Sequence, residues 1–80
     1  MSLYYFHLRD GVDILLDPEG RELANRGSIP EAALKEARSI IGHDAVSGRI
    51  LLDQHIDVED EFRNILHTLH FADAVEIVRP

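Results

Sequence analysis

The segment from Ser28 to Ser47 constrains the fold more than any other, because it is the only stretch long and periodic enough to predict a helix. Polar residues fill most of its positions, while small and aliphatic side chains recur at spacings of three and four. These are Ala33, Leu34, Ala37, Ile40, Ile41 and Ala45. The apolar stripe is narrow and rich in alanine, which predicts close packing of the helix against a sheet.

Both ends of this helix carry sequence signals. Ser28 and Glu31 have the spacing of a capping box, in which each side chain accepts from the other residue's backbone N–H, and Pro30 suits the first turn. Gly48 lies where a left-handed residue would close the last turn. Gly42, inside the helix, is unfavourable by about 1 kcal/mol relative to alanine. It therefore predicts close packing or a loose final turn.

The N-terminal third predicts a β-hairpin. Residues Leu3 to Leu8 are aromatic or branched apart from His7, and Val12 to Leu16 form a second apolar run. Between them, Asp10-Gly11 has the composition of a tight turn, and Asp17 to Gly20 has turn chemistry after the second strand. Arg21 to Gly27 is a polar connection in which Leu23 is the one apolar residue that predicts a core contact.

The C-terminal third predicts a second hairpin. Apolar side chains alternate with polar ones from Ile50 to Val58, Glu59 to Glu61 reads as a charged turn, and Phe62 to Phe71 returns. A three-residue loop places one group of polar side chains on a solvated face: Asp53, His55, Asp57, Arg63 and His67. The apolar residues Ile65, Leu69 and Phe71 favour the opposite face, so the pattern requires either a bulge or a turn that differs by one residue.

These elements predict a single α+β domain over residues 1–80. Two β-hairpins flank one helix in the order β-β-α-β-β, and the helix packs on one antiparallel sheet. The tail from Ala72 to Pro80 contains Val75, Ile77 and Val78, and predicts a fifth short strand or, as an alternative, a helical turn.

Charge and composition exclude several functions. The chain has 8 basic and 15 acidic residues, a formal net charge of −7, which repels nucleic acid. It contains no cysteine, so thiolate metal sites and disulfides are excluded. No apolar run approaches the about 20 residues that span a bilayer, and the N-terminus lacks a signal-peptide pattern, so we expect no membrane partner and a cytoplasmic location.

Four segments together resemble one protein family. They are the opening Tyr5-Phe6-His7-Leu8-Arg9-Asp10-Gly11, the turn Asp17-Pro18-Glu19-Gly20, the alanine-rich helix that ends near Ser47-Gly48, and the closing Phe71-Ala72-Asp73-Ala74-Val75-Glu76-Ile77. The family consists of short alphaproteobacterial proteins, common in rhizobia, with a domain of unknown function. The resemblance implies a shared fold and no activity. About half of the chain is also similar to HicB-type antitoxins, at the level of strand, turn and helix order.

Two groups of residues are candidates for binding. Asp53, His55 and His67 would bind Zn²⁺ or Mn²⁺ if neighbouring strands brought them together, since imidazole and carboxylate suit these ions. No nucleophile, glycine-rich phosphate loop or cofactor motif is present, so we expect no enzymatic activity and no cofactor. The first strand, if it lies at the sheet edge, would offer an interaction edge through Tyr4, Tyr5 and Arg9.

The first functional hypothesis is therefore a non-enzymatic protein-interaction module that forms a homodimer, because a chain of this size gains stability by burying surface against a partner. The second is an antitoxin-like module whose acidic surface binds a basic partner protein. The third is the metal-binding domain.

Overall fold

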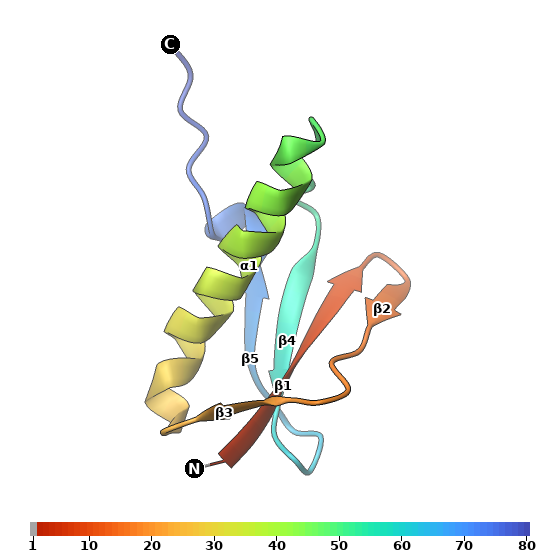
Figure 1. Ribbon diagram of the computed structural model, residues 1–80, viewed down its shortest axis with the longest axis vertical. Helices are drawn as coiled ribbons and strands as arrows, with labels where there is room; N and C mark the ends of the chain where they lie inside the picture. Colours follow the sequence, from red (N-terminus) through yellow and green to blue (C-terminus); the bar gives the residue numbers. More distant parts are fainter. Residues whose placement is uncertain (1) are drawn as a thin grey trace.

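The computed structural model describes residues 2–80 and shows one α-helix packed against an antiparallel sheet (Figure 1). The α+β class is confirmed. The elements follow the predicted β-β-α-β-β order, except that the fifth strand precedes the helix instead of following the second hairpin. The elements are β1 (Ser2–Asp10), β2 (Asp13–Leu15), β3 (Arg21–Leu23), α1 (Ile29–Val46), β4 (His55–Glu59) and β5 (Ile65–His70), with 3₁₀ turns η1 (Arg26–Ser28) and η2 (Phe71–Asp73).

Strand β1 lies in the interior of the sheet. The strand order is β2-β1-β4-β5, and β3 also pairs with β1. The C-terminal end of β1 pairs with β2, its N-terminal end with β3, and Tyr5 to Arg9 with β4. The prediction of an interaction edge at Tyr4, Tyr5 and Arg9 is therefore wrong in its premise, because β1 is paired along its length. In the described chain, β2 and β3 lie at the sheet edge beside β1, and β5 forms the opposite edge, beside β4.

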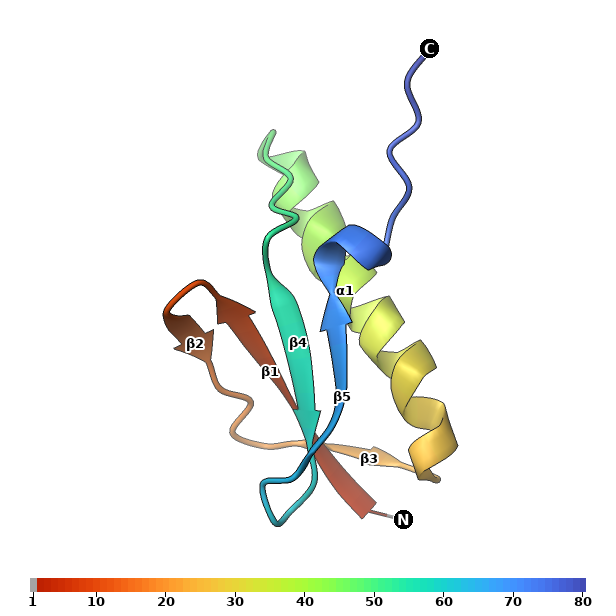
Figure 2. The ribbon, with the colours of Figure 1, turned by 180° about the vertical axis from the view of Figure 1, so that it is seen from behind.

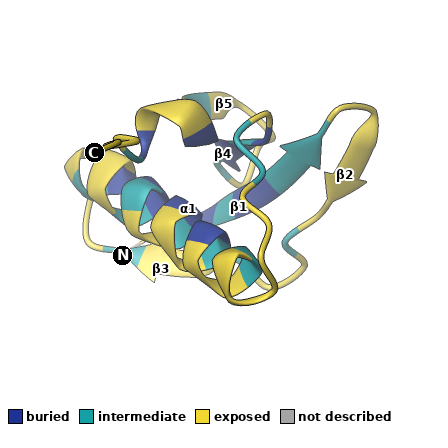
Figure 3. Ribbon diagram, turned by 90° about the horizontal axis from the view of Figure 1, so that it is seen from above, coloured by how far each residue is buried: buried dark blue, intermediate teal, exposed yellow. Residues whose placement is uncertain are grey.

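Helix α1 covers one face of the sheet, as Figure 3 shows from above. Its buried residues are Ile29, Ala33, Ala37 and Ile41. They join a core whose other members are Tyr4, Phe6, Ile56, Val58, Phe71 and Ala74. Ala33 and Ala37 are fully buried, and their small side chains let the helix approach the sheet closely. The predicted packing of an alanine-rich helix face on a sheet is confirmed.

The two ends of α1 differ in how well the sequence predicted them. Gly48 has a φ of 86°, the left-handed conformation expected after the last turn. The capping box is wrong, because Ser28 has helical φ and ψ angles and its side chain makes no cap hydrogen bond. Ser28 ends the 3₁₀ turn η1, and its Oγ donates to Asn25 Oδ1 at 3.4 Å instead. Pro30 does lie in the first turn, as predicted.

Gly42 is exposed, and a Cβ built on it would have no heavy atom within 4 Å. Close packing therefore does not explain this glycine. Because alanine has the higher helix propensity, Gly42→Ala is expected to raise the free energy of unfolding by about 1 kcal/mol. Urea denaturation followed by circular dichroism measures the change. A loss of stability would show that the glycine has a role in the helix that its open surroundings do not reveal.

The second hairpin differs from its prediction in strand limits, turn and register. β4 begins at His55 rather than Ile50, and β5 begins at Ile65 rather than Phe62. Asp57 pairs with Thr68 and Val58 with His67, but Glu59 pairs with Ile65, so a bulge shifts the register after Val58. The bulge is one of the two alternatives that the apolar pattern required. It explains why Leu69 faces the same side as Ile56, as predicted, whereas Ile65 pairs with Glu59 and faces the other side, contrary to the prediction.

The tail does not form the predicted fifth strand. Phe71–Asp73 forms the 3₁₀ turn η2, and residues 74–80 follow without regular structure and extend away from the sheet (Figure 2). The fifth strand is instead β3, in the segment predicted as a polar connection.

Among residues 2–80, no helix has both the length and the apolar character needed to cross a membrane.

Candidate functional site: the uncovered face of the sheet

The face of the sheet opposite α1 carries a group of polar and aromatic side chains, which we call the open face. Figure 2 looks toward this face, with the helix behind the sheet. Because side chains alternate along a strand, the pairing register places the residues that are not in the core on this face. They are Tyr5, His7 and Arg9 of β1, His55, Asp57 and Glu59 of β4, and Thr68 and His70 of β5.

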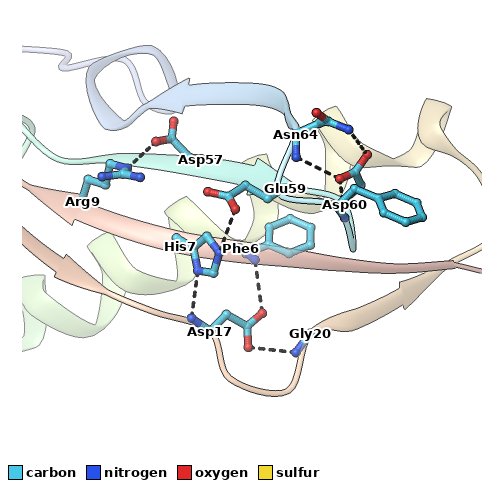
Figure 4. A network of polar contacts seen from close by, with 10 residues as sticks. Phe6, His7, Arg9, Asp17, Gly20, Asp57, Glu59, Asp60 and Asn64 are labelled. Carbon is cyan, nitrogen blue, oxygen red and sulfur yellow. Dashed lines mark hydrogen bonds and ion pairs between the residues drawn. The ribbon is translucent and has the colours of Figure 1, made fainter.

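Asp57 is at the centre of the open face and is only 5% exposed. Its carboxylate forms an ion pair with Arg9 Nε (Figure 4). It also accepts a hydrogen bond from Thr68 Oγ1 at 2.8 Å. His55 Nε2 lies 3.7 Å from Asp57 Oδ2. A buried carboxylate needs such partners to stay charged. The three strands β1, β4 and β5 are thereby joined through one side chain.

His7 is held on the open face in one tautomer. Its Nδ1 accepts a hydrogen bond from the backbone N–H of Asp17 at 3.0 Å, so the ring proton of the neutral form is on Nε2. That Nε2 lies 3.7 Å from Glu59 Oε1. The ring also stacks on Tyr5, with 6.3 Å between centroids. These contacts favour a structural role for His7, as expected for a histidine between strand residues.

Asp17 lies in the segment between β2 and β3. Its side chain bonds to the middle of β1, which neither of these two strands pairs with. Its Oδ2 accepts from the backbone N–H of Phe6 at 3.2 Å, and its Oδ1 accepts from the N–H of Gly20 at 3.2 Å (Figure 4). Gly20 has a φ of 75°, and a Cβ there would lie 2.9 Å from Cε2 of Tyr5. We call residues 16–20 the clamp loop. It fastens the base of the β1–β2 hairpin to the middle of β1.

A groove of about 680 Å³ crosses the open face beside the clamp loop. Its lining includes Tyr5 and His7 and the apolar residues Leu16, Pro18 and Ile65. The remaining lining residues are Asp17, Glu59, Asp60, Glu61 and Arg63. Carboxylates predominate among the charged groups, so the groove favours neutral or cationic groups over anions.

The β4–β5 turn closes the far end of this groove. Asp60 Oδ1 accepts from the N–H groups of Phe62 and Asn64, at 2.8 and 2.9 Å, and Oδ2 accepts from Asn64 Nδ2 at 3.0 Å. Arg63 has a φ of 66°, so the loop 61–63 ends in a left-handed residue. β4 ends at Glu59 and β5 begins at Ile65, so the connection has five residues, 60–64, rather than the three of the predicted turn from Glu59 to Glu61.

The hydrogen bond from the Asn64 side chain, together with backbone N–H groups, lowers the pKa of Asp60 below its ordinary value. A lowered folded-state pKa means that the turn's contribution to stability is present above the unfolded pKa and is lost as pH falls through the folded value. Asn64→Ala is therefore expected to raise the pKa of Asp60 toward its ordinary value. An NMR titration of the Asp60 carboxyl carbon measures it, and Glu61→Gln is the matched control. An unchanged pKa in Asn64→Ala would contradict the assigned cause.

The structure does not bring the predicted metal ligands together. Asp53 is exposed in the loop before β4. His55 pairs with His70 on the open face, whereas His67 pairs with Val58 and faces the helix side. The shift in register explains the difference, because the predicted register had placed His67 on the same face as Asp53 and His55. Within residues 2–80, no three His, Cys, Asp or Glu side chains are arranged to hold a metal ion.

Sequence reasoning missed some residues of the open face. It placed Asp57 on a polar face correctly, but it interpreted Asp17 as a turn residue only and assigned Thr68 no contact on that face. Glu59 was placed in a turn. For Asp17 the signal was weak, since an aspartate before proline in a turn is explained by local geometry alone.

The family model of DUF6894, a domain of unknown function, matches residues 3–72 of the chain. The match therefore includes all five strands, the helix and part of η2. No curated protein and no solved structure matches the chain.

Proposed function

Since the chain belongs to the DUF6894 family, whose function is unknown, we propose from its surface that it is a non-enzymatic protein-interaction module that self-associates. The contact surface is the β1–β2 hairpin. The observation that carries this proposal is the concentration of exposed apolar side chains on that hairpin. The partner that binds this surface is a second copy of the chain.

The hairpin exposes Val12, Ile14, Leu15 and Leu16, with exposed fractions of 97%, 48%, 69% and 64%. Four large apolar side chains thus lie within five consecutive positions. Figure 1 shows why they are uncovered: the hairpin projects to one side of the sheet, while α1 lies across the other strands. Ile14 pairs with Arg9 and projects from the open face, whereas Leu15 pairs with Leu8 and projects from the helix side. The hairpin therefore exposes apolar side chains on both faces, and a concentration of this kind is typical of interaction sites.

A groove between the hairpin and α1 can take up the exposed hairpin side chains of a second copy. It has a volume of about 320 Å³, and Leu15, Leu16 and Ile40 are among its apolar lining residues. Because the hairpin and the groove share Leu15 and Leu16, one two-fold axis can place the hairpin of each copy against the groove of the other. Such an isologous contact uses the hairpin and the groove of each copy at once, which favours a closed dimer over an open-ended polymer.

Two polar groups of the open face, Asp57 and His7, support the non-enzymatic part of the proposal. Asp57 is paired with Arg9 and Thr68, and His7 accepts from a backbone N–H through Nδ1. A general base needs a free lone pair that faces a substrate. The described lone pairs of these groups are already directed at protein donors.

Sedimentation velocity over a range of protein concentrations tests the proposal. We expect the wild-type chain to form a dimer and the double variant Leu15→Ser/Leu16→Ser to be monomeric, because the variant removes apolar area from both the hairpin and the groove. Each copy carries a net charge of −7, so added salt should strengthen the wild-type dimer by screening the repulsion.

Val46→Ser is the matched control, since Val46 is 89% exposed but lies at the end of α1, outside the hairpin. It should dimerise like the wild type. Circular dichroism checks that the double variant remains folded. A wild-type chain that is monomeric at every concentration would contradict self-association, and equal dissociation in the double variant and in Val46→Ser would contradict the hairpin as the interface.

A further inference from the structure

Two histidines of the open face lie directly opposite each other on neighbouring strands. His55 of β4 pairs with His70 of β5, and their ring centroids are 5.3 Å apart with the rings tilted by 46°. Opposite residues of an antiparallel pair project from the same face. The two imidazoles are therefore neighbours on the open face, on strands that do not belong to the β1–β2 hairpin.

This separation suits a shared metal ion. Imidazole nitrogen binds Zn²⁺ at about 2.0–2.1 Å, so two rings on one tetrahedral ion have their centroids about 5 Å apart. The two rings are already at that spacing without a bound ion. A metal therefore requires rotation of the rings, but no movement of the strands.

Asp57 is placed to support one of these ligands. Its Oδ2 lies 3.7 Å from His55 Nε2, and Arg9 and Thr68 hold the carboxylate in place. A carboxylate at the second ring nitrogen of a ligating histidine favours the tautomer that leaves the first nitrogen free and increases its basicity. A rotation of the His55 ring that shortens this 3.7 Å separation to hydrogen-bond length would leave Nδ1 free to bind the ion.

The site is also accessible to an ion and to water. His70 is exposed and His55 is half-buried, so solvent can supply the remaining ligands of a four-coordinate ion. Two protein ligands are fewer than the four of a closed structural site, and within residues 2–80 no group of three His, Cys, Asp or Glu residues is arranged to hold a metal ion. They also mean that binding is weaker than at a closed structural site.

We propose that His55 and His70 form a binding site for a divalent transition-metal ion that prefers imidazole, such as Zn²⁺, Ni²⁺ or Cu²⁺, with Asp57 as the supporting carboxylate. The site replaces the set predicted from sequence, which consisted of Asp53, His55 and His67. It does not depend on self-association, because its residues lie outside the hairpin.

Isothermal titration of the untagged chain with Zn²⁺ and with Ni²⁺, at about pH 7.5 where histidine is mainly neutral, tests the proposal. We expect saturable binding that is lost in His55→Ala and in His70→Ala. His67→Ala is the matched control, because this histidine is on the same strand as His70 but faces the helix side, and it should bind as the wild type does. Asp57→Asn is expected to weaken binding by about 10-fold to 100-fold.

NMR of the histidine rings provides a second measurement that does not depend on heats of binding. Metal should perturb the ring signals of His55 and His70 and leave those of His7, His43 and His67 unchanged. Two outcomes would overturn the proposal: no saturable binding by the folded wild type, or equal loss of binding in His67→Ala and His70→Ala. If Asp57→Asn binds as tightly as the wild type, the supporting role of the carboxylate is wrong.

Discussion

Phe71→Ala is expected to lower the free energy of unfolding by about 3–5 kcal/mol, the largest loss for a single truncation in this chain. Phe71 is fully buried and is one of the three largest such side chains in residues 2–80. It belongs to the core between α1 and the sheet, and its backbone N–H donates to the carbonyl of Gln54 at 3.0 Å. Removal of the ring leaves a cavity where the end of β5 meets the helix. Urea denaturation followed by circular dichroism measures the loss.

Phe62→Ala is the control for this truncation. Phe62 has the same side chain but is 82% exposed in the β4–β5 turn, so its removal is expected to change stability by less than about 0.5 kcal/mol. Phe71→Leu keeps part of the buried volume and should lie between the two. Similar losses in Phe71→Ala and Phe62→Ala would show that burial does not decide the outcome.

Phe71 also shows which features of this fold can be predicted from sequence patterns and which cannot. The helix was predicted within one residue at each end, because its period and the left-handed Gly48 are local signals. Phe71 was assigned to a strand, since an apolar residue at an alternating position looks the same whether it ends a strand or begins a 3₁₀ turn. Burial in the core identifies it, and burial depends on contacts with α1 that are distant in sequence.

The same distinction applies to the sheet. The first hairpin was predicted because Asp10-Gly11 is a strong turn signal, whereas β3 was not, because Arg21–Leu23 contains one apolar residue in three. The residues of β3 contribute in another way: Arg21 lies over the Phe6 ring, 4.6 Å from its centroid, and forms an ion pair with Glu36 of α1. Such contacts depend on the tertiary fold, so strand propensity does not report them.

The candidate site was predicted less well than the fold, and the reason is register. The composition of the second hairpin indicated a polar sheet face, but which polar side chains meet depends on the position of the bulge after Val58. A shift in pairing exchanges His67 for His70 as the neighbour of His55 and moves one of them to the opposite face. Turn and bulge geometry is specified by hydrogen bonds such as those of Asp60, which an alternating pattern does not encode.

Asp17→Ala is expected to produce the second large effect, a loss of about 3 kcal/mol. The carboxylate accepts from the part-buried backbone N–H groups of Phe6 and Gly20. A donor left unpaired away from water is unfavourable by about 1–3 kcal/mol. Native-state hydrogen exchange should show faster exchange at the Phe6 amide than at the Val58 amide in the middle of β4. Glu19→Ala, an exposed neighbour in the clamp loop, should leave both rates unchanged.

Asp17→Asn separates geometry from charge. One amide oxygen can still accept from Gly20, but the NH₂ group cannot accept from Phe6, so this variant should recover only part of the lost stability. Because the clamp loop fastens the base of the β1–β2 hairpin, Asp17→Ala should also weaken self-association, although Leu15 and Leu16 are unchanged. If Asp17→Ala frees the Phe6 amide and still dimerises like the wild type, the hairpin does not need its position on the sheet to form the interface, and the groove beside α1 is not its receptor.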